Sequence, residues 1–262
     1  MRVRTGLLAP GLLALGILAP LVPLLLWAVA GEFRWPALLP APSSRGLARV
    51  LDADVLAALG TSAAVAGTVA VLAAALGLAA GRALGSHAFR GRRLVQLLLL
   101  APAIVPTLAV TLGIQVFFIR FGLADTVAGV VLVHLVPTVP YVSLVMAGVF
   151  AGFDERLLDQ ARVLGACPLA RLRHAVLPAV APGLAVAALF AFLISWSEYV
   201  LTLLVGGGTV RTLPLLLFAA IGSADLTAAA ALGLVLAAPP LVLVVLASRV
   251  LTGPAALGFG RV

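Results

Sequence analysis

The sequence predicts an all-α, polytopic membrane protein with six transmembrane helices. Of its 262 residues, 63% are hydrophobic and 10% are charged, and the mean hydropathy is +1.24. A soluble globular domain carries a much larger charged fraction. Apolar runs of about 20 residues, the length that crosses the hydrocarbon core of a bilayer, recur along the chain. The expected spans are residues 7–30, 55–82, 94–118, 126–150, 176–205 and 226–251.

The arginines predict the orientation of these spans. All seventeen basic residues are Arg, and with six spans twelve lie on one side of the membrane and five on the other, where five acids accompany them. Because loops rich in Arg stay in the cytoplasm, both termini and residues 153–175 are expected to be cytoplasmic. This topology explains the net charge of +8. The expected contact of these arginines is anionic membrane lipid, and no nucleic acid is expected as a partner.

The first span, residues 7–30, is expected to be retained as an anchor. Its apolar run is longer than the core of about 7–15 residues that is typical of a cleaved signal peptide. The core spans then cover residues 55–251. The hydrophilic intervals are too short to fold alone, so a single transmembrane domain is expected over residues 1–262. Cys167 is the only cysteine, which excludes an intrachain disulfide.

The external end of the second span carries two acids, Asp52 and Asp54. They could form the metal-binding pair of a lipid-linked transferase, but an acidic cap on the following helix is the favoured interpretation. The second span is rich in Gly, Ala and Thr, and such small residues let helices approach closely. Prolines predict kinks in the third and fourth spans, at Pro102, Pro106, Pro137 and Pro140.

Several kinds of chemistry are not expected. The chain has no lysine, the residue with which a P-loop binds phosphates, so it is not expected to hydrolyse ATP by itself. Three histidines and one cysteine show no metal-ligand spacing, and no cofactor, metal or catalytic residue is expected. His134, inside the fourth span, is expected to be a hydrogen-bonded structural residue in preference to a proton relay. His174 is expected to be an interfacial side chain.

Glu198 lies inside the fifth predicted span. An ionised carboxylate in hydrocarbon is costly, so it should face a partner, water or a pathway. Ser195, Glu198 and Thr202 are three and four residues apart and would form one polar stripe on a continuous helix. Two interpretations stay open. The stripe lines a translocation pathway, or Glu198 forms a structural pair with an arginine or hydroxyl of a neighbouring helix.

Residues 153–183 gather acids, arginines, a glycine and prolines between the fourth and fifth spans. Residues 153–164 place apolar side chains at helical spacing, with charges on the other face. Gly165 allows the chain to turn, and Pro168 suits the first position of a second short helix. A cytoplasmic helix–hinge–helix that can bind a partner protein is therefore expected between spans four and five.

This segment resembles the EAA loop of the membrane subunits of binding-protein-dependent (type I) ABC importers. In that family Glu-Ala-Ala is followed after three residues by Gly, and after nine more by Ile-x-Leu-Pro. The residues that keep this spacing here are Asp159, Gln160, Ala161, Gly165, Leu177 and Pro178. Asp159, Gln160 and Ala175 replace the family's Glu, first Ala and Ile. The six-span plan extends the resemblance over nearly the whole chain.

Residues 192–200 and 212–217 look most like the polyamine, ferric iron, thiamine and phosphonate permeases of that family. The resemblance implies a multi-pass subunit of the bacterial inner membrane that is no enzyme. Its implied partners are ABC ATPase subunits, a second permease subunit, identical or different, and an extracytoplasmic substrate-binding protein. It implies ATPase-coupling roles for Asp159, Gln160, Ala161, Arg162, Leu164, Gly165, Ala166, Leu177 and Pro178, with Arg171 at the rim of the contact. It also implies a pathway that includes Ser195, Glu198 and Thr202, and a carboxylate there would suit a cationic substrate.

Two other classes of protein stay open. A secondary transporter driven by an ion gradient would also use an intramembrane carboxylate such as Glu198, but it would need no cytoplasmic helix–hinge–helix. A membrane-embedded transferase would depend on Asp52 and Asp54. Co-purification with an ATPase subunit and a binding protein would separate an importer from both.

Overall fold

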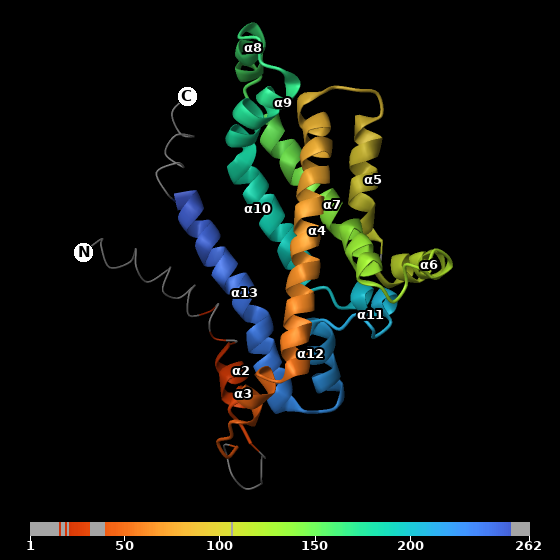
Figure 1. Ribbon diagram of the computed structural model, residues 1–262, viewed down its shortest axis with the longest axis vertical. Coiled ribbons are helices and arrows are strands. Elements are labelled where there is room, and N and C mark those ends of the chain that lie inside the picture. The colour runs from red at the N-terminus through yellow and green to blue at the C-terminus, as the bar shows by residue number, and fades with distance from the viewer. Residues whose placement is uncertain (1–15, 17–18, 20, 32–39, 106, 253–262) are drawn as a thin grey trace, which may run out of the picture. The chain divides into compact units, whose positions relative to one another are not determined.

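The computed structural model describes residues 16, 19, 21–31, 40–105 and 107–252, and the regular elements of this part are helices (Figure 1). Half of the predicted first span, residues 7–30, lies outside the described residues. The helices are α2 (Leu21–Ala28), α3 (Arg45–Val50), α4 (Ala53–Ser86), α5 (Arg92–Ile104), α6 (Thr107–Arg120), α7 (Val127–Ala151), α8 (Arg156–Val163), α9 (Pro168–Arg171), the π-helix η1 (Leu172–Val176), α10 (Leu177–Trp196), α11 (Val200–Gly206), α12 (Leu213–Gly222) and α13 (Leu226–Thr252).

Four described helical segments are long and apolar enough to cross a membrane. They cover Ala53–Ser86, Val127–Ala151, Pro168–Trp196 and Leu226–Leu243. These segments correspond to the second, fourth, fifth and sixth predicted spans, so the all-α membrane fold class is confirmed. The total of six spans stays a prediction.

The chain divides into two compact units. Unit 1 contains residues 1–60 and 211–241, and unit 2 contains residues 61–210 and 242–262. Helices α4 and α13 therefore run through both units. The expected single functional domain over residues 1–262 stays a prediction.

The core of unit 2 lies where α4, α7 and α10 pack together. Its buried side chains include Val142, Met146 and Phe150 of α7 and Val180 of α10. Three glycines four residues apart on α4 face α7, and a Cβ on Gly81 would lie 2.3 Å from the Cβ of Met146. This close approach confirms the prediction that the small residues of the second span allow tight packing.

Two of the predicted spans are interrupted. The third, 94–118, is divided between α5 and α6, because α5 ends at Ile104 and Val105 is extended (ψ 132°). A residue before proline disfavours the helical region, and Pro106 follows Val105. The fifth, 176–205, is divided between α10 and α11 by residues 197–199. The break in the third span lies at Pro106, one of the positions where a kink is predicted, whereas the expectation of a continuous helix in the fifth span is wrong.

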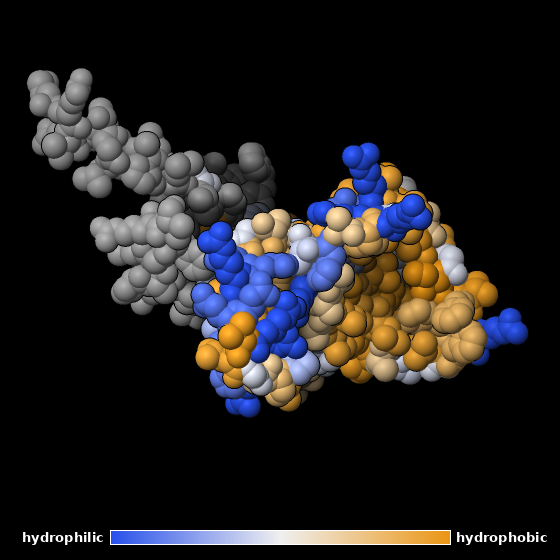
Figure 2. Space-filling view, turned by 90° about the horizontal axis from the view of Figure 1, so that it is seen from above, coloured by the Kyte–Doolittle hydropathy of each residue, from blue (hydrophilic) through white to orange (hydrophobic). Residues whose placement is uncertain are grey.

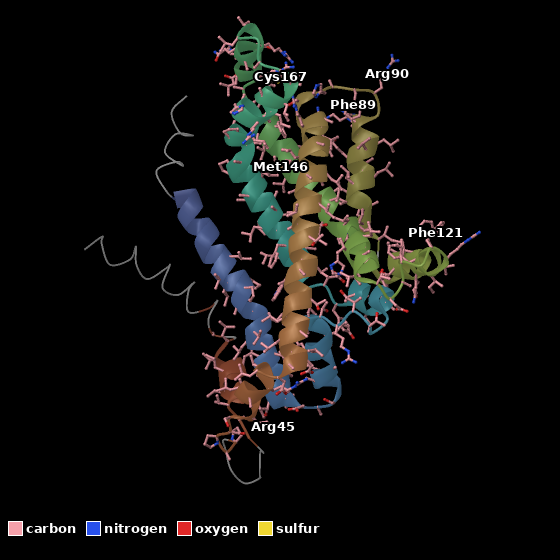
Figure 3. The ribbon with its side chains drawn as sticks, in the orientation of Figure 1. Arg45, Phe89, Arg90, Phe121, Met146 and Cys167 are labelled. Atoms are coloured by element: carbon pink, nitrogen blue, oxygen red, sulfur yellow. The ribbon has the colours of Figure 1, made fainter. Side chains whose placement is uncertain are left out.

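The helices of unit 2 place residues 153–175 and the basic turn 87–93 at the same end of the unit (Figure 1). Phe89 and Arg90, in the turn, and Cys167, beside α9, lie at this end (Figure 3). Seen from that end, hydrophilic residues (blue) lie next to hydrophobic surfaces (orange) (Figure 2). Residues 153–175, which the arginine count assigns to the cytoplasm, therefore share one end of unit 2 with the arginine-rich turn 87–93.

Unit 1 is held together by close contacts around α3 and the first turn of α13. Thr227 is buried, and its Oγ1 donates a hydrogen bond to the carbonyl of Ala30 at 3.0 Å. Gly46 lies so close to α2 that a Cβ on it would be 2.1 Å from the carbonyl oxygen of Ala28. Arg45 forms an ion pair with Asp225. These contacts join α2, α3 and α13.

Asp52 and Asp54 bind the same guanidinium group. Arg49 lies 2.8 Å from Asp52 Oδ2 and 2.7 Å from both oxygens of Asp54. The hydrogen bonds from Arg49 to Asp54 and then to Asp52 raise the pKa of the guanidinium above its ordinary value. Among the described residues no group of three or more His, Cys, Asp or Glu side chains could hold a metal ion. The side chains of both acids are hydrogen-bond partners of Arg49.

Candidate functional site

The helix–hinge–helix is formed by α8, Gly165 and α9. Gly165 has φ +77°, a left-handed conformation that side chains rarely adopt. Its N–H donates to the carbonyl of Arg162 at 2.9 Å, and the N–H of Ala166 donates to that of Ala161 at 3.0 Å. This pair of hydrogen bonds is a Schellman motif, which ends α8 and turns the chain. The predicted turn at Gly165 is confirmed.

The end of α8, the turn after it and the start of α9 expose large apolar side chains. Val163 is 88% exposed, Leu164 85% and Leu169 71%, whereas Leu158 points into the core of unit 2 and is 7% exposed. A hollow of about 550 Å³ runs along α8 and is lined by Arg156, Asp159, Gln160, Val163 and Leu164. We call Val163, Leu164 and Leu169 the apolar tip.

The polar residues of α8 surround this tip. Asp159 and Arg162 form an exposed ion pair at 2.7 Å, one turn apart on the helix. Gln160 is exposed, and Ala161 and Ala166 are partly buried. Of the residues assigned to ATPase coupling, the structure brings those at positions 159–166 together. It places Leu177 and Pro178 apart from them, at the start of α10.

The tip is connected to the core of unit 2 through η1. Val176, the last residue of this π-helical turn, is fully buried against residues of α7 and α10. Pro178 is the second residue of α10, and the helical residues run on through it without a break. The described helical residues from Pro168 to Trp196 are thus continuous.

Glu198 lies in the break between α10 and α11. Its Oε1 accepts a hydrogen bond from the N–H of Leu201 at 3.1 Å and caps the first turn of α11. The carboxylate is partly buried beside a cavity of about 50 Å³ that is lined by Pro102, Val110, Val136, Pro137, Glu198 and Leu201. This volume is enough for one or a few water molecules. The expected polar stripe on a single continuous helix is wrong, because the helix is interrupted at Glu198.

Ser195 and Thr202 converge on a third residue, His134 of α7. The imidazole Nδ1 lies 2.8 Å from Ser195 Oγ, and Nε2 lies 2.9 Å from Thr202 Oγ1. His134 is 1% exposed, so the expectation of a hydrogen-bonded histidine is confirmed. Sequence reasoning missed these two partners, which are 61 and 68 residues away along the chain. The sequence signal that points to such partners is a histidine in the middle of an apolar run, which needs hydrogen-bond partners inside the protein.

The comparison with protein families identifies the chain. The sequence profile of the family described as "Binding-protein-dependent transport system inner membrane component" matches residues 73–252, a range that includes the helix–hinge–helix and Glu198. The chain belongs to this family. The permease subunits of ABC transporters that form it are not enzymes themselves, and ATP hydrolysis occurs in partner subunits.

Curated relatives of this permease include polyamine transport proteins. The spermidine/putrescine permease PotC of Haemophilus influenzae is 30% identical over 155 residues, which are 58% of this chain and 60% of the relative. PotC of Escherichia coli is 27% identical over 170 residues, 64% of each chain. A putative ABC transporter permease of Streptomyces antibioticus is 35% identical over 105 residues, which are 40% of this chain and 46% of that protein. These matches span less than two thirds of the relatives' lengths.

Two solved structures share the fold of this permease. One is a bacterial ABC transporter involved in the import of the acidic polysaccharide alginate, with a TM-score of 0.72, 17% identity and 94% of each chain covered. The other is a bacterial alginate ABC transporter in complex with an alginate-bound periplasmic protein, with a TM-score of 0.68 and 14% identity over 95% of this chain and 93% of that one. At this identity the likeness shows the fold alone.

Proposed function

We propose that this permease subunit forms half of the translocation pathway of an ATP-driven importer in a bacterial inner membrane. The observation that carries the proposal is the apolar tip, which is exposed at the end of a charged helix within a matched ABC permease. In this proposal the importer also contains two ATPase subunits, a second permease subunit that is identical or different, and an extracytoplasmic binding protein. Both termini lie in the cytoplasm.

The apolar tip supports a partner-binding role on energetic grounds. Burying a leucine or valine side chain fully contributes about 1.5–3 kcal/mol. Val163, Leu164 and Leu169 are largely exposed, while the other face of α8 is anchored by the buried Leu158. The face that leaves the core is therefore free to enter a cleft of an ATPase subunit. Asp159 and Arg162 border it and would make polar contacts at the rim.

The mechanism follows from the connection between the tip and the membrane helices. Closure of two ATPase subunits on ATP would draw two such tips together, and the continuous helix from Pro168 to Trp196 would carry the movement into unit 2. Driving a two-state equilibrium from 1:99 to 99:1 takes about 5.5 kcal/mol of differential binding. The cycle would thereby turn the pathway outward to receive cargo from the binding protein and inward to release it.

The proposed cargo is a small cationic solute such as a polyamine. Glu198 supports this choice because its carboxylate lies beside a cavity at a helix break, where a passing cation would meet it. The names of the relatives agree with this chemistry. Thiamine, ferric iron and phosphonates are the other cargoes of the resembling group. A phosphonate would be repelled by Glu198.

The proposal is tested by placing a charge in the apolar tip. Leu164→Asp should abolish co-purification of the ATPase subunit and uptake of radiolabelled spermidine by cells that express the whole importer. Phe89→Asp is the matched control, because Phe89 is an exposed apolar residue at the same end of unit 2 but outside the helix–hinge–helix. Normal ATPase binding by Leu164→Asp would disprove the coupling role.

The pathway role is tested separately with Glu198→Gln, which removes the charge and keeps the shape. Spermidine uptake should fall while ATPase binding is retained. If both the uptake rate and the preference between spermidine and putrescine are unchanged, Glu198 serves as the cap of α11 alone.

A further inference from the structure

The imidazole of His134 touches both sides of the helix break that carries Glu198. Ser195 lies in the last turn of α10, and Thr202 lies in the first turn of α11. Each of their hydroxyls is within 2.9 Å of a different ring nitrogen of His134. The three side chains are buried, with exposures of 5% or less. One side chain of α7 therefore joins the two helix ends that residues 197–199 separate.

The hydrogen bonds around His134 define where its proton is. Thr202 Oγ1 is also 3.2 Å from the carbonyl oxygen of Glu198. Because a carbonyl oxygen can only accept, the single hydroxyl proton of Thr202 is donated to it. Nε2–H of His134 then donates to Thr202 Oγ1, and Nδ1 accepts from the hydroxyl of Ser195. A neutral imidazole with its proton on Nε2 satisfies every one of these groups.

This chain of hydrogen bonds ends on Glu198. The hydroxyl of Thr202 donates a hydrogen bond to the carbonyl of Glu198, and the N–H of Leu201 donates one to the carboxylate of Glu198. Both donors belong to the first turn of α11, which His134 ties to α7. The cavity beside the carboxylate is lined partly by Val136 and Pro137 of the same helix α7. The position of the carboxylate relative to its cavity thus depends on the contact between His134 and Thr202.

We propose that His134 is a positioning residue of the translocation pathway. It holds the end of α10 and the start of α11 on α7, and it thereby fixes where the Glu198 carboxylate meets the cargo. The role in transport rests on the proposed function, whereas the hold on the helix break is a property of this chain alone.

Two isosteric variants separate the two contacts of the ring. His134→Gln keeps an amide nitrogen near the place of Nε2, so it can still donate to Thr202. His134→Asn keeps a polar atom near the place of Nδ1 and loses Thr202. Because Thr202 holds Glu198, His134→Asn should reduce the maximal rate of spermidine uptake by about tenfold, and His134→Gln should retain most of it. His87→Gln is the matched control, since His87 is exposed in the turn 87–93.

The double variant His134→Asn/Glu198→Gln distinguishes positioning from a general structural role. If His134 acts through the carboxylate, the double variant transports spermidine as fast as Glu198→Gln alone. If His134 only supports the fold, its tenfold loss recurs in the Glu198→Gln background, and the proposal is overturned. Equal uptake by His134→Asn and the unchanged importer would also overturn it.

A measurement without cargo separates failure of this inference from failure of the proposed function. Amide hydrogen exchange of the purified importer complex should become faster in residues 197–203 of His134→Asn, and stay unchanged there in His87→Gln. Unchanged exchange in His134→Asn would disprove the hold on the helix break. If the unaltered importer carries neither spermidine nor putrescine, the proposed cargo is wrong, and hydrogen exchange alone decides the positioning role.

Discussion

Replacing Gly81 by alanine should separate α4 from α7. The new Cβ would lie 2.3 Å from the Cβ of Met146, 2.9 Å from the Met146 carbonyl carbon and 3.0 Å from the backbone nitrogen of Ala147. Two of these atoms belong to the backbone of α7, so a side-chain rotation cannot relieve the contact. Carbon atoms pack best at about 3.5–4.0 Å, and the helices must therefore move apart by roughly 1 Å.

This movement has a calculable cost. A gap of roughly 0.5–1 Å forfeits a quarter to a half of the dispersion energy of the atoms that border it. Overpacking of this kind destabilises a protein by about 1–3 kcal/mol. Gly67→Ala is the matched control on the same helix, because a Cβ there meets nothing within 4 Å. It should be neutral or stabilising by up to about 1 kcal/mol, the difference in helix propensity between alanine and glycine.

Thermal unfolding of the two variants in detergent, followed by loss of the monodisperse peak in size-exclusion chromatography, measures this difference. Gly81→Ala should lose the peak at a lower temperature than the unaltered protein, and Gly67→Ala should not. If both variants unfold at the same temperature, α4 and α7 do not pack at the described distance, and the argument is refuted.

Three further predictions concern the hinge, α7 and unit 1. In Gly165→Pro the proline cannot adopt φ +77° and lacks the N–H of the Schellman motif. Uptake should be lost although the protein still inserts, and normal uptake at normal expression would contradict the coupling role. Gly129→Ala would place a Cβ 1.9 Å from the carbonyl oxygen of Leu123 and should reduce the yield of folded protein. In the control Gly148→Ala, on the same helix, the Cβ meets nothing within 4 Å, and equal yields of the two variants would refute the prediction. Thr227→Val removes a buried hydrogen bond and should cost about 1 kcal/mol in thermal unfolding, against no change for the exposed Thr68→Val.

Local signals in the sequence predict much of this fold. The long helices α4 and α7 begin and end within a few residues of the predicted spans, because about 20 apolar residues in a row have few alternatives to a helix in a membrane. The turn at Gly165 also follows from local chemistry, since glycine is the residue that adopts a left-handed conformation most easily. These features depend on neighbours along the chain.

The break at Glu198 and the site around it depend on distant residues. Ser197, Glu198 and Tyr199 include no Gly or Pro, so their composition gives no reason for a helix to end. The C-terminal end of α10 and the N-terminal end of α11 are hydrogen-bonded to His134, which lies more than 60 residues earlier in the chain. Such pairings are not visible in a single sequence. Helix α12 lies outside the predicted spans because its ten residues are too few to cross a membrane.

The uninterrupted rod from Pro168 to Trp196 has a consequence for the amplitude of motion. Its 29 residues give a length of about 43 Å at roughly 1.5 Å per residue. A tilt of about 5° around one end of such a rod displaces the other end by about 4 Å, more than the radius of a water molecule. Trp196 is followed directly by the break that carries Glu198. A small rotation imposed on α9 would therefore be magnified into a displacement wide enough to open or close the passage beside that carboxylate.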